Sequence, residues 1–221
     1  MNLPIQFLTS LNQVTSTIVY ELKKVGIYHY NKLTYLFEYL FIKNFGTRYT
    51  NEKFIKLPHG PVISNYKKQI TDLTQLHFYN TNLEELNKSR KLVEDDYAMK
   101  IYIYSNDNTK ELLINNLMVY DFLLRVLEKY AYLNTDDLEK IIYNTLPMKK
   151  YIEKMKKGFK KPTGGYVLDS SNISVKECAG ELSKARKILL KHVEKYPFVN
   201  LEQQKKFEEE FSYLEKLRPE W

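Results

Sequence analysis

The sequence predicts a mainly α-helical protein of the α+β class: a compact multi-helix domain with a small antiparallel sheet of two or three strands and a C-terminal helical extension. Apolar residues recur at three- and four-residue intervals along several segments, which is the spacing of helices that bury one face. Residues 97–104 instead alternate at period two, as a strand does. Hydrophobic residues make up 43% of the 221 residues, which is enough to bury a sizeable core.

The N-terminal part predicts two helices that pack as a helical hairpin at the base of the core. The first runs from about residue 13 to residue 25 and is ended by Gly26, because glycine is common just after a helix. Asn31 is the expected N-cap of the second helix. The buried stripe of this second helix is formed by Leu33, Leu36, Phe37, Leu40 and Phe41.

A stiff corner follows a short extended run over residues 53–57. Pro58 and Pro61 restrict the backbone, and Gly60 can adopt a shape that a side chain would forbid. Because proline suits the first helical position, Pro61 is expected to open a helix that continues over residues 62–76. The N–H groups of residues 62–64 would then point out of the corner and could hold an acidic partner group, or the corner could be a plain strand-to-helix joint.

The rest of the chain predicts one sheet, more helices and a boundary. Residues 77–79 and 53–57 are expected to pair with the strand over residues 97–104. A long helix is expected over residues 112–130, then a shorter one capped by Asn134 or Thr135 and stopped before Pro147, then another to about Lys157. We therefore expect a domain over residues 1–157, a loop over 158–172 and a C-terminal helical pair over 173–221, packed on the first domain.

Composition narrows the class of protein. The 34 Lys and Arg residues outnumber the 27 Asp and Glu residues, and the formal charge of +7 favours acidic partners. Cys178 is the only cysteine, which excludes an internal disulfide and a zinc site made of cysteines. With neither a secretory signal nor a long uncharged apolar stretch, we expect a cytoplasmic protein without membrane association.

The positive charge is concentrated in one segment. Tyr151 and Phe159 lie among its lysines, so the segment could contact an acidic protein or the phosphates and bases of a nucleic acid. A solvated helix end is the simpler interpretation, and the absence of a helix-turn-helix pattern weakens the nucleic-acid alternative. The segment contains Lys149, Lys150, Lys154, Lys156, Lys157, Lys160 and Lys161.

The sequence gives no indication of catalysis. The four histidines are isolated, and the motifs H-E-x-x-H, G-x-G-x-x-G and G-x-S-x-G and a phosphate-binding P-loop are all missing. Asp136 lies in the first turn of a predicted helix, where capping is its expected role. The sequence therefore predicts a protein that is not an enzyme and needs neither a metal nor a cofactor.

Several segments, taken in order, resemble a known family. They are Lys32-Leu33-Thr34-Tyr35-Leu36, then Gly46, then the corner Lys56-Leu57-Pro58-His59-Gly60-Pro61-Val62, and a late helix with Leu133, Asp137 and Leu138 that closes near Pro147. This order resembles the Panacea domain, which is found in bacterial and phage antitoxins and in the SocA-type protease adaptor. The resemblance covers about residues 14–154, and Met148 stands where many relatives have a tryptophan.

The resemblance implies an antitoxin that neutralises a cognate protein toxin by direct contact, without a cofactor. One alternative is an adaptor that delivers the toxin to an ATP-dependent protease, and another is a nucleic-acid-binding protein of a phage or mobile element. The corner is the expected partner-binding surface. Its residues are Lys56, Leu57, Pro58, His59, Gly60, Pro61, Val62 and Ser64.

Overall fold

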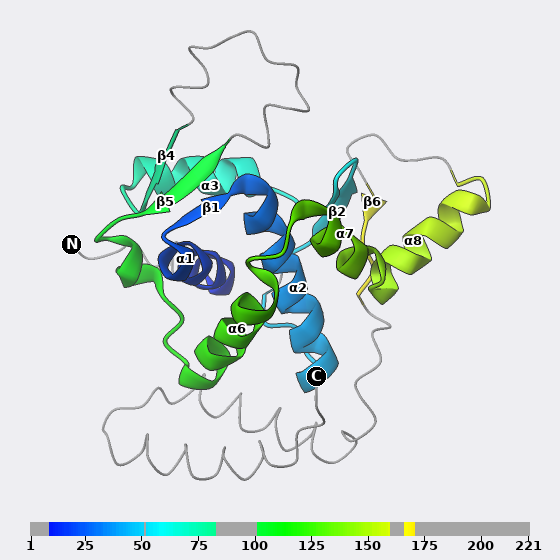
Figure 1. Cartoon of the computed structure of the whole chain (residues 1–221), viewed down its shortest axis with the longest axis horizontal. Coiled ribbons are helices and arrows are strands. Elements are labelled where there is room, and N and C mark those ends of the chain that lie inside the picture. Colours follow the sequence, from blue (N-terminus) through cyan, green and yellow to red (C-terminus); the bar gives the residue numbers. More distant parts are fainter. Residues whose placement is uncertain (1–8, 51, 83–100, 160–165, 171–221) are drawn as a thin grey trace, which may run out of the picture.

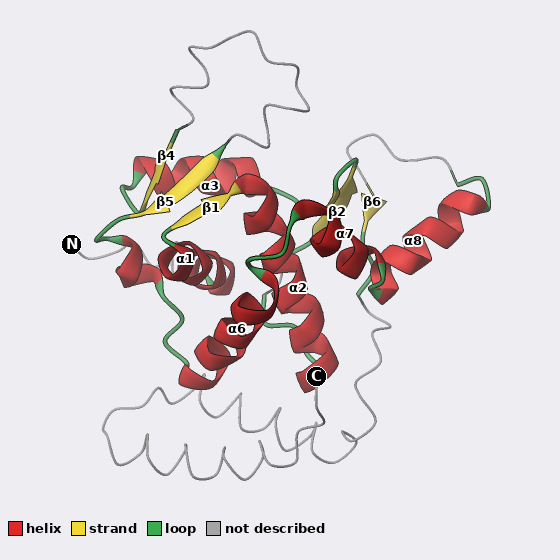
Figure 2. Ribbon diagram, viewed as in Figure 1, coloured by secondary structure: helices red, strands yellow, loops and turns green. Residues whose placement is uncertain are grey.

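The structure is a computed structural model that describes residues 9–50, 52–82, 101–159 and 166–170. These residues form six α-helices, a short 3₁₀-helix and two small antiparallel sheets, which confirms the mainly helical α+β class. Figure 2 shows the strands in two separate groups among the helices. The predicted C-terminal helices, residues 173–221, lie outside the described residues. No helix in the described ranges is both long and apolar enough to cross a membrane.

The first two helices are separated by a strand. Helix α1, Ser10–Leu22, is capped by Thr9. Helix α2, Ile27–Phe45, follows strand β1, Lys24–Gly26. The prediction that one helix continues to residue 25 is wrong: Lys23 has a φ of 60°, which ends the helix, and the chain then pairs as a strand. Gly26 accordingly precedes α2 instead of closing α1.

The predicted N-cap of α2 is also wrong. The helix begins at Ile27, so Asn31 lies inside it and is buried, with Nδ2 donating to the Ile27 carbonyl at 2.9 Å. The predicted apolar stripe is correct and forms the centre of the core. Ring centroids of Phe37, Phe41 and Phe45 lie 5.3–5.8 Å from that of Phe122. Helix α2 therefore passes through the middle of the molecule, as Figure 1 shows.

One sheet has the strand order β1-β5-β4, and the other has the order β3-β2-β6. Strand β4 is Tyr79–Thr81 and β5 is Tyr102–Ser105. Strand β2 is Phe54–Leu57, β3 is Gly60–Ile63 and β6 is Tyr166–Val167. The expected pairing of the segment that ends at Tyr79 with the strand before residue 105 is correct, as β4 and β5. The expectation that residues 53–57 join the same sheet is wrong, because β2 pairs with β3 and β6. Residues 97–100 of the predicted strand lie outside the described residues.

The corner is a β-hairpin and not a strand-to-helix joint. Pro61 lies in β3, and the next helix, α3 at Tyr66–Gln75, begins only after it. The predicted helix over residues 62–76 is thus correct only in its later part. Proline can occupy an edge strand as well as a first helical turn, and contacts with α2 select the strand here.

The remaining helices follow the predicted order. A 3₁₀-helix at Thr109–Leu112 precedes α6, Leu117–Tyr130, which begins later than predicted because Asn116 caps it. Asn134 caps α7, Thr135–Tyr143, by accepting from the Asp137 N–H at 2.9 Å, as the sequence predicts. Helix α8, Leu146–Lys156, has Pro147 in its first turn.

Candidate partner-binding site

The hairpin formed by β2 and β3 has Pro58 and His59 at its turn, and Leu57 pairs with Gly60. Ser64 N–H donates to the Lys53 carbonyl at 3.0 Å, so these two residues form a hydrogen-bonded pair. Hydrogen-bonded and non-hydrogen-bonded pairs alternate along an antiparallel ladder, which makes Pro61 and Lys56 a non-hydrogen-bonded pair. Pro61 then falls at a position where its nitrogen points away from β2. The missing N–H of this proline therefore removes no bond from the ladder.

The outward N–H groups predicted for residues 62–64 do not form an anion-binding corner. Ser64 N–H is used by the ladder, and Ile63 N–H donates to Asn31 Oδ1 at 3.0 Å. Asn31 thus joins helix α2 to the hairpin, donating within its own helix and accepting from β3. The backbone of this segment contributes to docking the hairpin on α2 and not to capture of an acidic group.

Lys32 forms the second link between α2 and the hairpin. Its side chain is nearly fully buried, with 1% exposed, and Nζ donates to the Pro61 carbonyl at 2.9 Å. The ammonium also lies 4.8 Å from the centroid of the Tyr28 ring, a favourable position for a buried cation. A motif residue of helix α2 therefore holds the motif proline of the hairpin.

Gly60 is required at this joint for two reasons. Its φ is +97°, a conformation that L side chains rarely adopt, and a Cβ at this position would lie 3.0 Å from Lys32 Nζ and 3.2 Å from Cε. Any larger residue would have to displace a buried lysine as well as adopt a strained backbone. The glycine thus allows the turn to lie directly against α2.

Lys56 supports the turn from the other side. Its side chain is buried, and Nζ donates to the carbonyls of Leu57 and Pro58, the latter at 3.1 Å. The same ammonium lies 5.3 Å from the Tyr143 ring centroid and 5.6 Å from that of Tyr151. It therefore fixes the turn carbonyls and connects the hairpin to α7 and α8.

The charge of Lys56 affects the ionisation of Lys32. Burial, together with the nearby charge of Lys56, lowers the pKa of Lys32 to about 7, and Glu139 acts in the opposite direction. Burial also raises the pKa of Tyr28, whose hydroxyl has no hydrogen-bond partner among the described residues. The base of the hairpin thus buries two amines and a tyrosine hydroxyl, and burial disfavours the charged form of Lys32.

The structure divides the predicted partner-binding residues into a tip and a support. Pro58 and His59 are exposed, and Leu57 and Ser64 are half-buried. The other predicted residues are buried and hold the tip in place; they are Lys56, Gly60, Pro61 and Val62. A partner that approaches this surface would meet the turn first.

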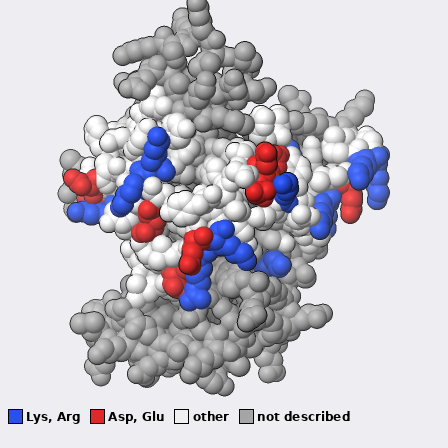
Figure 3. Space-filling view, in the orientation of Figure 1, with Lys and Arg blue, Asp and Glu red and all other residues white. Residues whose placement is uncertain are grey.

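The lysine-rich segment lies next to the hairpin. Lys149, Lys150, Lys154, Lys156 and Lys157 are on α8 or directly after it, and Figure 3 shows basic side chains gathered in the region of this helix. Lys160 and Lys161 lie outside the described residues. Strand β6, which follows this segment, pairs with β2. No signal in the sequence indicates this juxtaposition.

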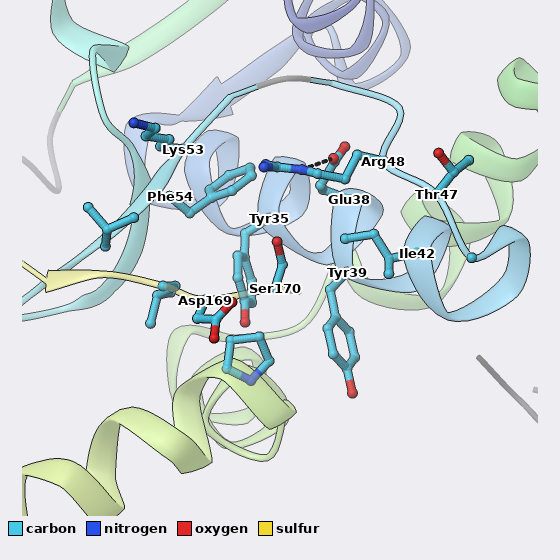
Figure 4. Close-up of a pocket in the computed structure, with 14 residues that line it drawn as sticks. Tyr35, Glu38, Tyr39, Ile42, Thr47, Arg48, Lys53, Phe54, Asp169 and Ser170 are labelled. Carbon is cyan, nitrogen blue, oxygen red and sulfur yellow. Dashed lines mark hydrogen bonds and ion pairs between the residues drawn. The ribbon is translucent and has the colours of Figure 1, made fainter. Parts of the chain in front are cut away.

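A cavity of about 630 Å³ lies between α2, β2 and the residues after β6 (Figure 4). One of its charged groups is Glu38, whose side chain is 3% exposed and accepts from Arg48 Nε at 3.1 Å and Thr50 N–H at 3.0 Å. Burial raises the pKa of Glu38, and the bonds from Thr50 and Arg48 oppose that effect. The sequence does hint at this site, because Glu38 interrupts the most hydrophobic window of the chain.

Within the described ranges, no three His, Cys, Asp or Glu side chains are close enough together to hold a metal ion. His29 is near a backbone group, with Nε2 lying 3.0 Å from the Leu133 carbonyl. The cavity beside Glu38 contains an ion pair with Arg48, and the buried lysines of α2 and β2 donate to carbonyls of the hairpin.

The family described as antitoxin SocA-like, Panacea domain, matches residues 31–147, which is more than half of the chain. The chain therefore belongs to the Panacea domain family, as its motifs predicted. The match includes most of α2, the hairpin and α7. No curated protein and no solved structure matches the chain.

Proposed function

We propose that this protein is the antitoxin of a toxin–antitoxin pair and that it neutralises its cognate toxin by direct protein–protein contact. Membership of an antitoxin-like family supports this function. Because the proposed function is binding, it depends on the affinity for the toxin and on the shape of the contact surface. The toxin is expected to be a protein that is harmful when it is produced alone.

The observation that carries the proposal is a firmly supported hairpin with an exposed turn. Asn31 and Lys32 attach the hairpin to α2, and Lys56 binds the turn carbonyls, while Pro58 and His59 remain accessible. Ordering a flexible side chain on binding costs roughly 0.5–1.5 kcal/mol. A turn that is already fixed before binding avoids much of this cost, which favours tight association.

The antitoxin would neutralise the toxin by covering part of the toxin's surface. The tip and the neighbouring helices would contact the toxin over a preformed surface and block access to the groups that the toxin needs. The exposed proline has a fixed φ, and His59 offers a ring that can pack and hydrogen-bond. The antitoxin in this mechanism changes no covalent bond.

Co-expression tests the proposal. The product of the neighbouring gene should arrest growth when it is produced alone, and growth should be restored when this protein is produced with it. The two proteins should then co-purify as a complex. A neighbour that is harmless, or a toxic neighbour that this protein neither binds nor neutralises, would contradict the proposal.

A second candidate function keeps the same surface but changes the outcome for the toxin. The SocA-like description of the family favours an adaptor that delivers the bound toxin to an ATP-dependent protease. The two functions differ in toxin lifetime, which can be followed after protein synthesis is stopped. Direct neutralisation leaves the toxin present in a complex, whereas an adaptor makes it disappear when the protease is active.

A further inference from the structure

Three aromatic rings form an accessible cluster beside the hairpin. Tyr151 of α8, Phe159 just after that helix and Tyr166 of β6 lie in contact, with Tyr166 in the middle. Its ring centroid is 5.2 Å from that of Tyr151 and 5.8 Å from that of Phe159. Phe159 has 46% of its surface exposed, so the cluster presents apolar area to a partner. We call these residues, with the lysines described next, the α8–β6 patch.

Lysines lie along the helix that carries Tyr151, and Lys154 contacts the cluster. Lys150, Lys154 and Lys157 are spaced four and three residues apart, which places them along one side of α8 and its C-terminal end. Lys154 Nζ donates to the Tyr166 hydroxyl at 2.7 Å, and this bond raises the pKa of Lys154. The patch therefore combines fixed positive charge with a partly exposed ring.

Acidic groups near the patch are fewer than lysines. Glu153 lies on α8 and Asp169 follows β6, and Asp169 is close enough to influence Lys154. A surface with an aromatic centre and a charged margin has the composition of a protein–protein contact site. Its charge complements an acidic partner.

We propose that the α8–β6 patch binds an acidic segment of the toxin that also carries an apolar side chain. The apolar side chain packs on Phe159, and the carboxylates face Lys154 and Lys157. This inference rests on the proposed antitoxin function and adds the chemistry of the partner. It also makes the patch an extension of the hairpin surface, because Lys56 Nζ lies 5.6 Å from the Tyr151 ring.

The ring geometry favours a protein over a nucleic acid. The planes of Phe159 and Tyr166 meet at 89°, and those of Tyr151 and Tyr166 at 54°. Single-stranded nucleic acids bind through successive bases that stack on open ring faces. In the patch, the rings contact one another edge to face, so they do not form a row of parallel faces on which successive bases could stack. This geometry suits the packing of a protein side chain.

Charge reversal with a matched control tests the inference. The variant Lys154→Glu/Lys157→Glu changes the patch, and Lys67→Glu/Lys110→Glu makes the same change in net charge on exposed lysines of α3 and the 3₁₀-helix. Titration of the purified toxin at low salt should show a roughly tenfold loss of affinity for the patch variant and a much smaller loss for the control. The difference should shrink near 1 M salt, where the screening length is about 3 Å.

Removal of the ring tests the apolar part separately. Phe159→Ala should weaken toxin binding by roughly tenfold at low and at high salt, whereas Phe159→Leu should retain most of the affinity. Circular dichroism and thermal unfolding of each variant establish that the fold is kept. Affinities of Lys154→Glu/Lys157→Glu and Phe159→Ala that equal the wild-type value would overturn the inference.

The outcomes separate the two proposals. If the wild-type protein does not bind the toxin, the proposed antitoxin function fails. If the wild-type protein binds and the patch variants bind equally well, only the patch inference fails. If labelled single-stranded RNA or DNA binds the wild-type protein but not Lys154→Glu/Lys157→Glu, while toxin binding is unchanged, the patch is a nucleic-acid site and the inference is overturned.

Discussion

The two sheets of this protein are attached to neighbouring helices in different ways. In the β1-β5-β4 sheet, buried Tyr79 places its hydroxyl 3.0 Å from Ser16 Oγ and 3.3 Å from Thr15 Oγ1 of α1. In the β3-β2-β6 sheet, a buried lysine and a glycine with positive φ hold the hairpin on α2. The first arrangement uses neutral groups, and the second places a charge in the interior.

The difference between the two sheets shows that features which cost stability are concentrated under the hairpin. A buried amine and a left-handed backbone both cost stability, and such features persist where the surroundings fix them. Here they lie under a turn that remains exposed. We infer that the hairpin region serves binding and that the other sheet serves stability, and variants of each sheet test this division of roles.

The largest expected effect is that of Gly60→Val. A β-branched side chain would combine a positive φ with a clash against Lys32, and we expect a loss of roughly 3 kcal/mol in the free energy of unfolding. Toxin neutralisation should be lost with the hairpin geometry. Denaturant unfolding and growth rescue measure the two effects, and normal neutralisation by this variant would contradict the assigned surface.

A paired alanine substitution isolates the contribution of Lys32 to this effect. Gly60 and Gly158 both have positive φ, but a Cβ on Gly158 would meet no atom within 4 Å. Gly158→Ala should therefore cost about 1 kcal/mol from the backbone alone, and Gly60→Ala should cost more. Equal losses would show that the close approach to Lys32 is unimportant.

Lys32 should make the stability of the hairpin region depend on pH. Its pKa is about 7 in the folded protein and 10.5 for a free lysine, so between these values the unfolded chain binds more protons. The free energy of unfolding should therefore rise with pH across this window, by on the order of 2 kcal/mol from pH 7 to pH 9. Lys56, Glu139, Tyr28 and Tyr143 are the ionisable groups around it.

Unfolding measured at both pH values for the wild type and Lys32→Met gives the contribution of this one group. The variant should show a smaller rise, and comparing slopes removes the constant loss of the bond to the Pro61 carbonyl. Identical slopes would mean that Lys32 does not titrate in this window.

Tyr79→Phe tests the other sheet. The substitution removes the hydroxyl that contacts Ser16 and Thr15 and should cost about 1–2 kcal/mol. Toxin affinity, measured under conditions where the variant is folded, should remain unchanged. Weaker toxin binding by the folded variant would contradict the inference that this sheet serves stability and not binding.

The smallest expected effect on stability is that of His59→Ala. The residue is exposed at the turn, and substitutions at such sites usually change stability by less than about 0.5 kcal/mol. Thermal unfolding checks this expectation. A large loss would indicate that His59 supports the hairpin and is not simply displayed by it.

Local signals in the sequence predicted much of the fold. The stripe containing Leu33 and Phe41 identified α2, Asn134 is one of the two residues predicted to cap α7, and the motif order identified the family. Each of these features depends on residues close together in the chain or on a distinctive pattern. Such information is present in the sequence itself.

The pairing of β4 with β5 was predicted in part, but most other features that depend on distant contacts were not. Pro61 could begin a helix or lie in an edge strand, and bonds from Asn31 and Lys32 to the hairpin decide between them. Strand β1 is short and acquires its structure by pairing with β5, far along the chain. The contact between α8 and the hairpin likewise depends on Lys56 reaching Tyr151.

The sequence contains only a weak indication that Lys32 is buried. Lys32 lies one turn before Leu36, on the flank of the apolar stripe of α2, where a charge is unexpected. Its burial follows from the position of the Pro61 carbonyl, which only the folded hairpin supplies. Helix periodicity alone therefore could not identify it as part of the site.

The affinity of His59→Arg for the cognate toxin tests most directly whether the hairpin turn is a binding surface. The substitution adds bulk and charge to an exposed position and leaves the bonds from Asn31, Lys32 and Lys56 in place. We predict that the variant folds with wild-type stability and binds the toxin at least roughly tenfold more weakly. Wild-type affinity in this variant would contradict the account.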